Sequence, residues 1–204
     1  MPLTVDQVRA LADAMPARNR AMVIVQAGLG LRLGELLALR VQEVDYATRT
    51  VRIEWQFAPQ SKVRIEPKTR RSRTAPLPQV VATAIREHSA QFPPTTDGTI
   101  FTTRFAGPYR HDYYGSLIFS SAVERAGLPK STTSHDLRHH YASVLLMQGE
   151  SVIVVADRLG HENATLVLST YGHLMPDPEE RTRRAVDDAW GCAPGVPQSA
   201  GPTA

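Results

Sequence analysis

The chain has 204 residues, of which 42% are hydrophobic and 21% charged; this is enough for one good-sized core and unlike the composition of a disordered protein. A single cysteine, Cys192, excludes a disulfide-stapled secreted scaffold, and no apolar run approaches the roughly 18 residues that span a bilayer. The net charge is only +3, but 20 of the 23 basic residues are arginine, which binds phosphate through paired hydrogen bonds; a GC-rich coding sequence would give the same bias. We therefore expect a single cytoplasmic domain without membrane contact.

The first 40 residues are predicted to form three helices. Thr4 and Gln7 have capping-box spacing at the start of an amphipathic helix, and residues 18–27 form a more apolar second helix. A third helix follows a glycine pair, with Arg32 between leucines at its start. A partly buried guanidinium needs an anion, which could be the nearby Glu35 or a bound phosphate.

A small antiparallel sheet with a basic hairpin is predicted next. Residues 50–55 and 63–65 alternate apolar and polar side chains as half-buried strands do, and residues 74–77 are a possible third strand. Residues 62–73 carry one acid, Glu66, and six basic residues: Lys62, Arg64, Lys68, Arg70, Arg71 and Arg73. Such a cluster repels itself unless an anion neutralises it, so it indicates either a nucleic-acid contact or a solvated basic hairpin.

The middle of the chain is predicted to return to helices. Residues 78–91 form one helix, residues 99–105 are short and extended, and residues 113–126 form another helix that ends at Gly127. Residues 109–114 interleave aromatic and charged groups. They could contact DNA, but the pattern is more typical of a helix entry with half-buried tyrosines.

Residues 133–177 contain five of the seven histidines. Ser134 is predicted to cap a helix that presents His135 and Arg138 on one face, because the two residues are three apart. His139, His140 and His173 are interpreted as packing or surface residues.

Two further short helices complete this segment. The first is capped by Ser151 and ends at Gly160, which leaves His161 on a corner. The second is capped by Asn163 and carries Tyr171 in its last turn. A charged helix over residues 178–190 and an uncharged tail over residues 191–204, predicted to be disordered, complete the chain.

Three motifs of the chain resemble the tyrosine recombinases, also called the phage integrase family. HDLRHHYAS and RLGHENATLVLSTYGHL match the pattern His-x-x-Arg, then Leu-Gly-His, then a nucleophilic tyrosine ten residues on, and GLRLGELLALR resembles the first arginine motif. The resemblance implies a mainly helical α+β catalytic domain over residues 1–190, with a small three-stranded antiparallel sheet. It also implies six catalytic residues, namely Arg32, Lys68, His135, Arg138, His161 and Tyr171.

The same resemblance implies a role for each residue. Arg32 and Arg138 contact the scissile phosphate, His161 donates a hydrogen bond to it, Tyr171 is the nucleophile, His135 is its base and Lys68 is the general acid. The remaining basic hairpin residues would contact the DNA backbone: Arg64, Arg70, Arg71 and Arg73.

We therefore expect a prokaryotic or phage-encoded site-specific DNA recombinase that cleaves and rejoins strands through a 3′-phosphotyrosyl intermediate, without metal, cofactor or ATP. The partner is double-stranded DNA, and the family implies a monomer in isolation and a homotetramer on DNA, held through the C-terminal segment. Family members usually carry an N-terminal helical core-binding domain, which we expect to be absent here.

Three alternatives remain open at this point. The chain could be a DNA-binding module derived from an integrase that has lost catalysis, or a type IB topoisomerase, which shares the chemistry without strand exchange. His135 and His139 are four residues apart, so HDLRH also resembles the zinc-binding helix of metalloproteases. Asp136 stands where that motif needs glutamate, and the sequence offers no evident third ligand.

Overall fold

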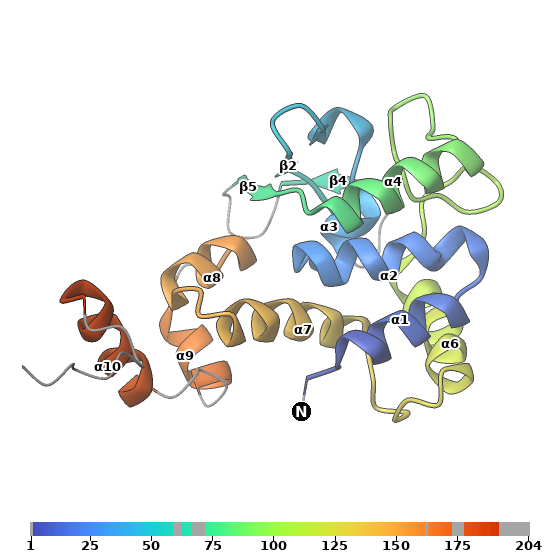
Figure 1. Cartoon of the computed structure of the whole chain (residues 1–204). Helices are drawn as coiled ribbons and strands as arrows, with labels where there is room; N and C mark the ends of the chain where they lie inside the picture. Colours follow the sequence, from blue (N-terminus) through green and yellow to red (C-terminus); the bar gives the residue numbers. More distant parts are fainter. Residues whose placement is uncertain (1, 59–62, 67–71, 162, 173–177, 192–204) are drawn as a thin grey trace, which may run out of the picture.

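The computed structural model describes residues 2–58, 63–66, 72–161, 163–172 and 178–191 (Figure 1). The first half contains, in chain order, α1 (Val5–Ala14), α2 (Ala17–Leu29), α3 (Leu33–Ala38), the 3-10 turn η1 (Val41–Glu43), the strands β1 (Val44–Asp45), β2 (Thr50–Ile53), β3 (Gln56–Phe57), β4 (Arg64–Ile65) and β5 (Arg73–Pro76), and helix α4 (Gln79–Gln91). The second half contains α5 (His111–Tyr113), the π-helix η2 (Tyr114–Phe119), α6 (Ser120–Arg125), α7 (Ser134–Met147), α8 (Val152–Leu159), α9 (Thr165–Tyr171) and α10 (Pro178–Ala189).

Several helix ends follow local signals. Thr4 and Gln7 form the predicted capping box, the Ser151 hydroxyl accepts from the Val154 N–H, and Gly160 ends α8 in the left-handed conformation at φ 65°. One predicted cap is wrong by one residue. Thr133, and not Ser134, caps α7, because it forms a capping box with Asp136.

The start of α9 also differs slightly from the prediction. Ala164 is the N-cap residue, and the Asn163 side chain accepts from the Thr165 N–H at 2.8 Å. Asn163 therefore still satisfies a backbone N–H at the start of α9, but it lies one position before the N-cap residue and not at it.

The three-stranded antiparallel sheet is confirmed, but one of its strands is not the predicted one. Its order is β1-β2-β5, with Val51 opposite both Val44 and Ala75. β4 pairs instead with β3 in a separate two-stranded sheet. The expected strand over residues 99–105 is reduced to isolated bridges, in which Thr99 meets Arg40 and Thr102 meets Pro108.

The helix expected over residues 113–126 begins earlier, at His111, and its middle is a π-helix. Tyr109 and Tyr114 are buried, whereas Tyr113 is half exposed. This burial agrees with the interpretation of residues 109–114 as a helix entry.

Two hydrophobic cores lie side by side, and α7 belongs to both. Leu137, near the start of α7, packs in the large core formed by α1 to α4, the three-stranded sheet and α6. Ala142 and Leu146, further along α7, pack in a smaller core with α8 and α9. Figure 1 shows α8 and α9 at one end of α7, with β5 above α8. The first turns of α7 therefore lie where the two cores meet.

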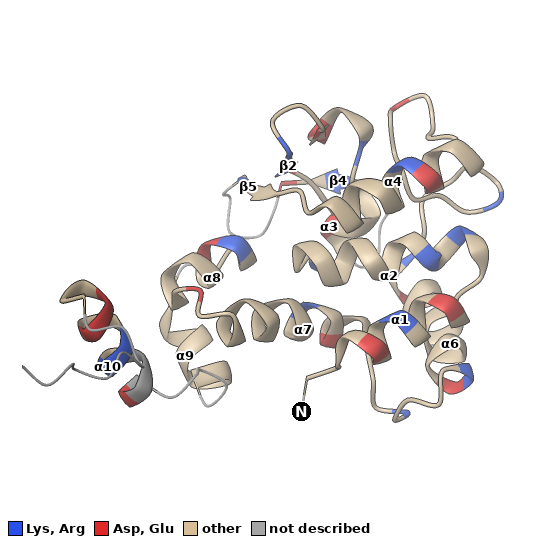
Figure 2. Cartoon of the chain, in the orientation of Figure 1, with Lys and Arg blue, Asp and Glu red and all other residues tan. Residues whose placement is uncertain are grey.

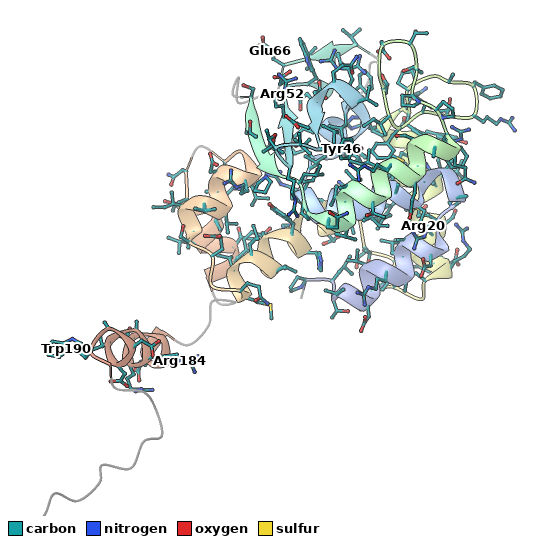
Figure 3. The ribbon with its side chains drawn as sticks, turned by 45° about the horizontal axis from the view of Figure 1, so that its top comes forward. Arg20, Tyr46, Arg52, Glu66, Arg184 and Trp190 are labelled. Atoms are coloured by element: carbon teal, nitrogen blue, oxygen red, sulfur yellow. The ribbon has the colours of Figure 1, made fainter. Side chains whose placement is uncertain are left out.

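Helix α10 lies apart from the rest of the described chain (Figures 1 and 3). It is rich in both charge signs, whereas α9 carries no charged residue (Figure 2). Trp190, just after α10, is 82% exposed. No helix among the described residues is long and apolar enough to cross a membrane.

Candidate active site

The carboxyl end of α8 is bound by three arginines from three other elements. The Arg73 Nε donates to the carbonyl of Arg158 at 2.9 Å, Arg138 Nη2 to that of Leu159 at 2.6 Å, and Arg32 Nη2 to that of Gly160 at 3.1 Å. These carbonyls lack partners within the helix and form the negative end of its dipole. The end of α8 therefore gathers cations from β5, α7 and the start of α3.

Glu35 is the carboxylate that balances two of these arginines. Its side chain is fully buried and accepts from Arg32 Nη1 at 2.9 Å and from Arg73 Nη1 and Nη2 at 2.9 and 2.7 Å. It also caps α3 by accepting from the Arg32 N–H at 2.8 Å. Burial alone would raise the pKa of Glu35, but Arg73 and Arg32 outweigh it and lower the pKa to about 2. Glu35 is therefore ionised at neutral pH and fixes the direction of both guanidinium groups.

Arg138 is the most deeply buried cation of the site, with a residue exposure of 2%. Its Nη1 donates to the carbonyl of Gly30 at 2.7 Å, in addition to the bond from Nη2 to Leu159. Burial, followed by the charge of Arg32, lowers the pKa of Arg138 to about 9, so the group stays protonated at pH 7. Two carbonyls, one at the end of α2 and one at the end of α8, thus hold one charged fork in place.

His161 contacts this fork directly. Its Nε2 lies 2.9 Å from Arg138 Nη2, while its Nδ1 is buried without a hydrogen-bond partner among the described residues. Because arginine only donates, Nε2 accepts here and the proton resides on Nδ1. Burial, followed by the charges of Arg138 and Arg32, lowers the pKa of His161 to about 4, so the ring is neutral at pH 7.

The Tyr171 hydroxyl forms a short hydrogen bond with Nδ1 of His139. Tyr171 ends α9 and packs in the smaller core, where burial raises the pKa of its hydroxyl. His135 lies one helical turn before His139, with the two rings perpendicular and their centroids 4.6 Å apart. Burial lowers the pKa of both histidines, so both are neutral at pH 7.

The structure brings together five of the six predicted catalytic residues. Arg32, Arg138 and His161 share the end of α8, and Tyr171 reaches His135 through His139. Lys68, like Arg70 and Arg71 of the same hairpin, lies outside the described residues.

His139, which the sequence analysis interprets as a packing residue, contacts the Tyr171 hydroxyl in the structure. Its position four residues after His135 places it one turn further on the same face, and that spacing was the available signal. In the part of the chain that is described, no group of three His, Cys, Asp or Glu residues is arranged to hold a metal.

Arg64 and Arg73, both predicted to contact DNA, make hydrogen bonds within the fold. Arg73 is buried, and its Nε and both Nη atoms bind Arg158 and Glu35. The Arg64 guanidinium binds the Ala38 carbonyl, Asp97 and Thr99, and its hydrogen bond holds the pKa of Asp97 far below the usual range. Both arginines therefore connect parts of the fold.

The described bonds leave side-chain donors of Arg32 available for a ligand. A guanidinium has five N–H groups, and the Arg32 side chain uses two of them, on Glu35 and Gly160, while remaining 33% exposed. Forked cations of this kind bind anions through paired hydrogen bonds, and a neutral imidazole can accept the proton of a phenol.

Similarity to known proteins extends over most of the chain. It is 29% identical to the tyrosine recombinase XerD of Corynebacterium glutamicum over 188 residues, which cover 86% of this chain and 57% of that protein. It is also 29% identical to the integrase of Staphylococcus phage L54a over 166 residues, covering 74% of this chain and 47% of that protein. The chain thus spans about half the length of the curated relatives that it matches.

Solved structures share the fold. The catalytic domain of bacteriophage HP1 integrase matches with a TM-score of 0.64 and 21% identity, covering 92% of this chain and 95% of that one. The integrase of transposon Tn1549, in complex with circular intermediate DNA, matches with a TM-score of 0.76 and 22% identity over 93% of this chain and 67% of that one. The family model described as "Phage integrase family" matches residues 2–177, and the chain therefore belongs to the phage integrase family.

Proposed function

We propose that this chain is the catalytic domain of a site-specific DNA recombinase that cleaves and rejoins DNA through a covalent 3′-phosphotyrosyl intermediate, without metal or ATP. The observation that carries the proposal is the buried Tyr171 hydroxyl, hydrogen-bonded to a neutral histidine beside the cluster of Arg32, Arg138 and His161. Family membership supports DNA as the substrate.

The arginines act on the phosphate. A phosphodiester repels a nucleophile, and its transition state spreads negative charge over the non-bridging oxygens. Arg32 and Arg138 bind those oxygens, and loss of one such donor would cost about 100- to 1,000-fold in rate. The site needs no conformational search for these groups, because Glu35 and the α8 carbonyls already hold them.

His161 stabilises the same phosphate. Burial and repulsion from Arg138 and Arg32 keep its ring neutral in the free protein, and an arriving anion would offset that repulsion and raise the pKa of His161. His161 then donates a hydrogen bond to a non-bridging oxygen.

Tyr171 attacks phosphorus and a histidine on the first turns of α7 removes its proton, because a phenol with a raised pKa is almost entirely protonated at pH 7. Lys68 protonates the departing 5′ oxygen. Bond energy is retained in the phosphotyrosyl link, so a 5′ hydroxyl can rejoin the strand by attacking it.

The partner is double-stranded DNA, with Arg70 and Arg71 as contacts to the DNA backbone, and the proposed location is the prokaryotic cytoplasm.

The protein is monomeric when free and tetrameric on DNA through its C-terminal segment. Val186 of α10 and Trp190 support this, being 53% and 82% exposed on a helix that stands apart (Figure 3). Sedimentation with and without DNA tests it; a DNA complex that never exceeds one protomer per site contradicts it.

The function is tested by incubating the full chain with supercoiled plasmid in EDTA. Wild-type protein should relax the plasmid and remain attached to DNA through a denaturing gel, whereas Tyr171→Phe should do neither. The matched control is Tyr46→Phe, which removes a hydroxyl from a tyrosine that packs under Arg86 elsewhere in the fold. Activity that requires added zinc and persists in Tyr171→Phe would overturn the proposal.

A further inference from the structure

The hydrogen-bond partner of the Tyr171 hydroxyl is His139, whereas the family resemblance assigned the base to His135. We propose that His139 is a catalytic residue, which accepts the Tyr171 proton during DNA cleavage and returns it during rejoining. This inference rests on the proposed function and assigns its proton transfer to a specific atom, His139 Nδ1.

The geometry supports direct transfer. His139 is on α7 and Tyr171 on α9, and their ring centroids lie 5.5 Å apart with Nδ1 directed at the hydroxyl. Tyr171 is 6% exposed, so bulk water has little access to its hydroxyl as a competing acceptor. A base within hydrogen-bond reach of its proton in the resting protein needs no rearrangement to act.

The charges around the pair favour the neutral, accepting form of His139. Burial lowers its pKa, and of the charged neighbours Asp136 raises it while Arg138 lowers it. In the described part of the chain, the other titratable groups that contact the ring are His135 on the same helix and Tyr171 on α9. For Nδ1 to accept from the phenol, the ring proton must reside on Nε2.

His135 is thereby left with a different task. Burial, followed by proximity to His139, lowers the pKa of His135, so when His139 becomes an imidazolium, His135 remains neutral. A neutral His135, perpendicular to His139, is able to hydrogen-bond to the phosphate. The two histidines therefore need not both be bases.

The proposed step balances in both directions. In cleavage the Oη–H bond of Tyr171 breaks, its proton moves to His139 Nδ1, Oη bonds to phosphorus, and the 5′ oxygen leaves with a proton from the general acid proposed above. In rejoining a 5′ hydroxyl returns its proton to that general acid, now deprotonated, and its oxygen bonds to phosphorus; the bond from phosphorus to Oη breaks, and the His139 imidazolium returns the proton to Oη. No oxidant or further reactant is needed.

The first test is spectroscopic and does not depend on DNA cleavage. Nitrogen-15 NMR of histidine-labelled protein reports which ring nitrogen is protonated, and Tyr171→Phe assigns the signal that changes. We expect Nδ1 of His139 to be unprotonated at pH 7 and its shift to move in Tyr171→Phe. A protonated Nδ1 in the neutral ring would overturn the inference and leave the proposed function intact.

The second test compares His139→Ala, His139→Gln and His135→Ala in the plasmid adduct assay, with thermal unfolding to confirm that each variant folds. Both His139 variants should form adduct about 100-fold more slowly or worse, the usual contribution of general base catalysis. Glutamine can still hydrogen-bond to the hydroxyl but cannot accept its proton, so it should be no better than alanine. Added imidazole should restore the rate of His139→Ala and not that of His135→Ala.

The pH dependence gives a further distinction. The wild-type rate should fall as pH drops through the pKa of His139, whereas the His139→Ala rate should keep rising with pH towards that of the phenol. Adduct formation by His139→Gln at nearly the wild-type rate, or imidazole rescue of His135→Ala alone, would overturn the inference. A wild-type protein that forms no adduct would overturn the proposed function, and this inference with it.

Discussion

Glu35→Gln should destabilise the protein strongly and in a pH-dependent way. The substitution keeps the volume of the side chain but removes the carboxylate that lies between Arg32 and Arg73. The pKa of Glu35 falls from 4.5 to about 2 in the folded state, which corresponds to about 3 kcal/mol in favour of folding at pH 7. This value agrees with the roughly 3–5 kcal/mol of stability that is lost when one partner of a buried ion pair is removed.

The sign of the pH dependence follows from the lowered pKa. An acid whose pKa is lower in the folded state stabilises the fold above its unfolded value, here 4.5, and loses that contribution as pH falls towards about 2. The difference in unfolding free energy between wild type and Glu35→Gln should therefore be about 3 kcal/mol at pH 7 and about 1.5 kcal/mol at pH 3.

Urea unfolding at several pH values measures this difference, and Glu43→Gln is the matched control. Glu43 is also buried and also pairs with the arginine three residues before it, Arg40, but among the described residues no second arginine binds it as Arg73 binds Glu35. Only Glu35→Gln should also slow adduct formation, because it releases Arg32. A pH-independent loss below about 1 kcal/mol, typical of an exposed pair, would refute the reasoning.

Two further predictions concern the same cluster. Arg32→Lys should keep the fold but form the DNA adduct at least about 100-fold more slowly in the plasmid assay. The reason is that one ammonium cannot replace a guanidinium fork held by Glu35 and Gly160. A rate near that of the wild type would contradict this prediction. Gly160→Ala should destabilise more than Gly127→Ala in thermal unfolding. Both glycines have a left-handed backbone, at φ 65° and 67°, so each alanine costs about 1 kcal/mol in backbone strain. At Gly160 the added methyl would also lie 3.0 Å from Arg73 Nη1, whereas at Gly127 it would meet no described atom within 4 Å. Equal losses would show that Arg73 moves aside freely.

Local interactions made much of the fold predictable from the sequence. The capping box of Thr4, the Ser151 cap and the Gly160 helix end depend on residues within four positions of each other, so their spacing alone predicts them. The pairing of Arg32 with Glu35 is likewise a one-turn interaction. The family motifs added the order of the site residues along the chain.

Strand partners were harder to predict from the sequence, because pairing depends on which strand edges meet in space. β4 has the alternation expected of a strand in the main sheet, yet it pairs with β3, while β1 at Val44–Asp45 takes the third place beside β2. The two-residue strands involved carry too short a pattern to specify a partner.

Only the tertiary structure decided which basic residues belong to the interior. Arg73 sits in a run of basic residues that resembles a solvated or DNA-binding hairpin, and its burial depends on the end of α8, 85 residues later in the chain. The partner of Tyr171 was decided in the same way, since spacing on α7 presents His135 and His139 on one face without saying which one α9 meets. By itself the sequence determined most of the helices, some of their caps and the chemical groups on offer. The packing of α8 and α9 against α7, and of α8 against β5, determined which groups touch, because long-range contacts and burial are set by the whole fold.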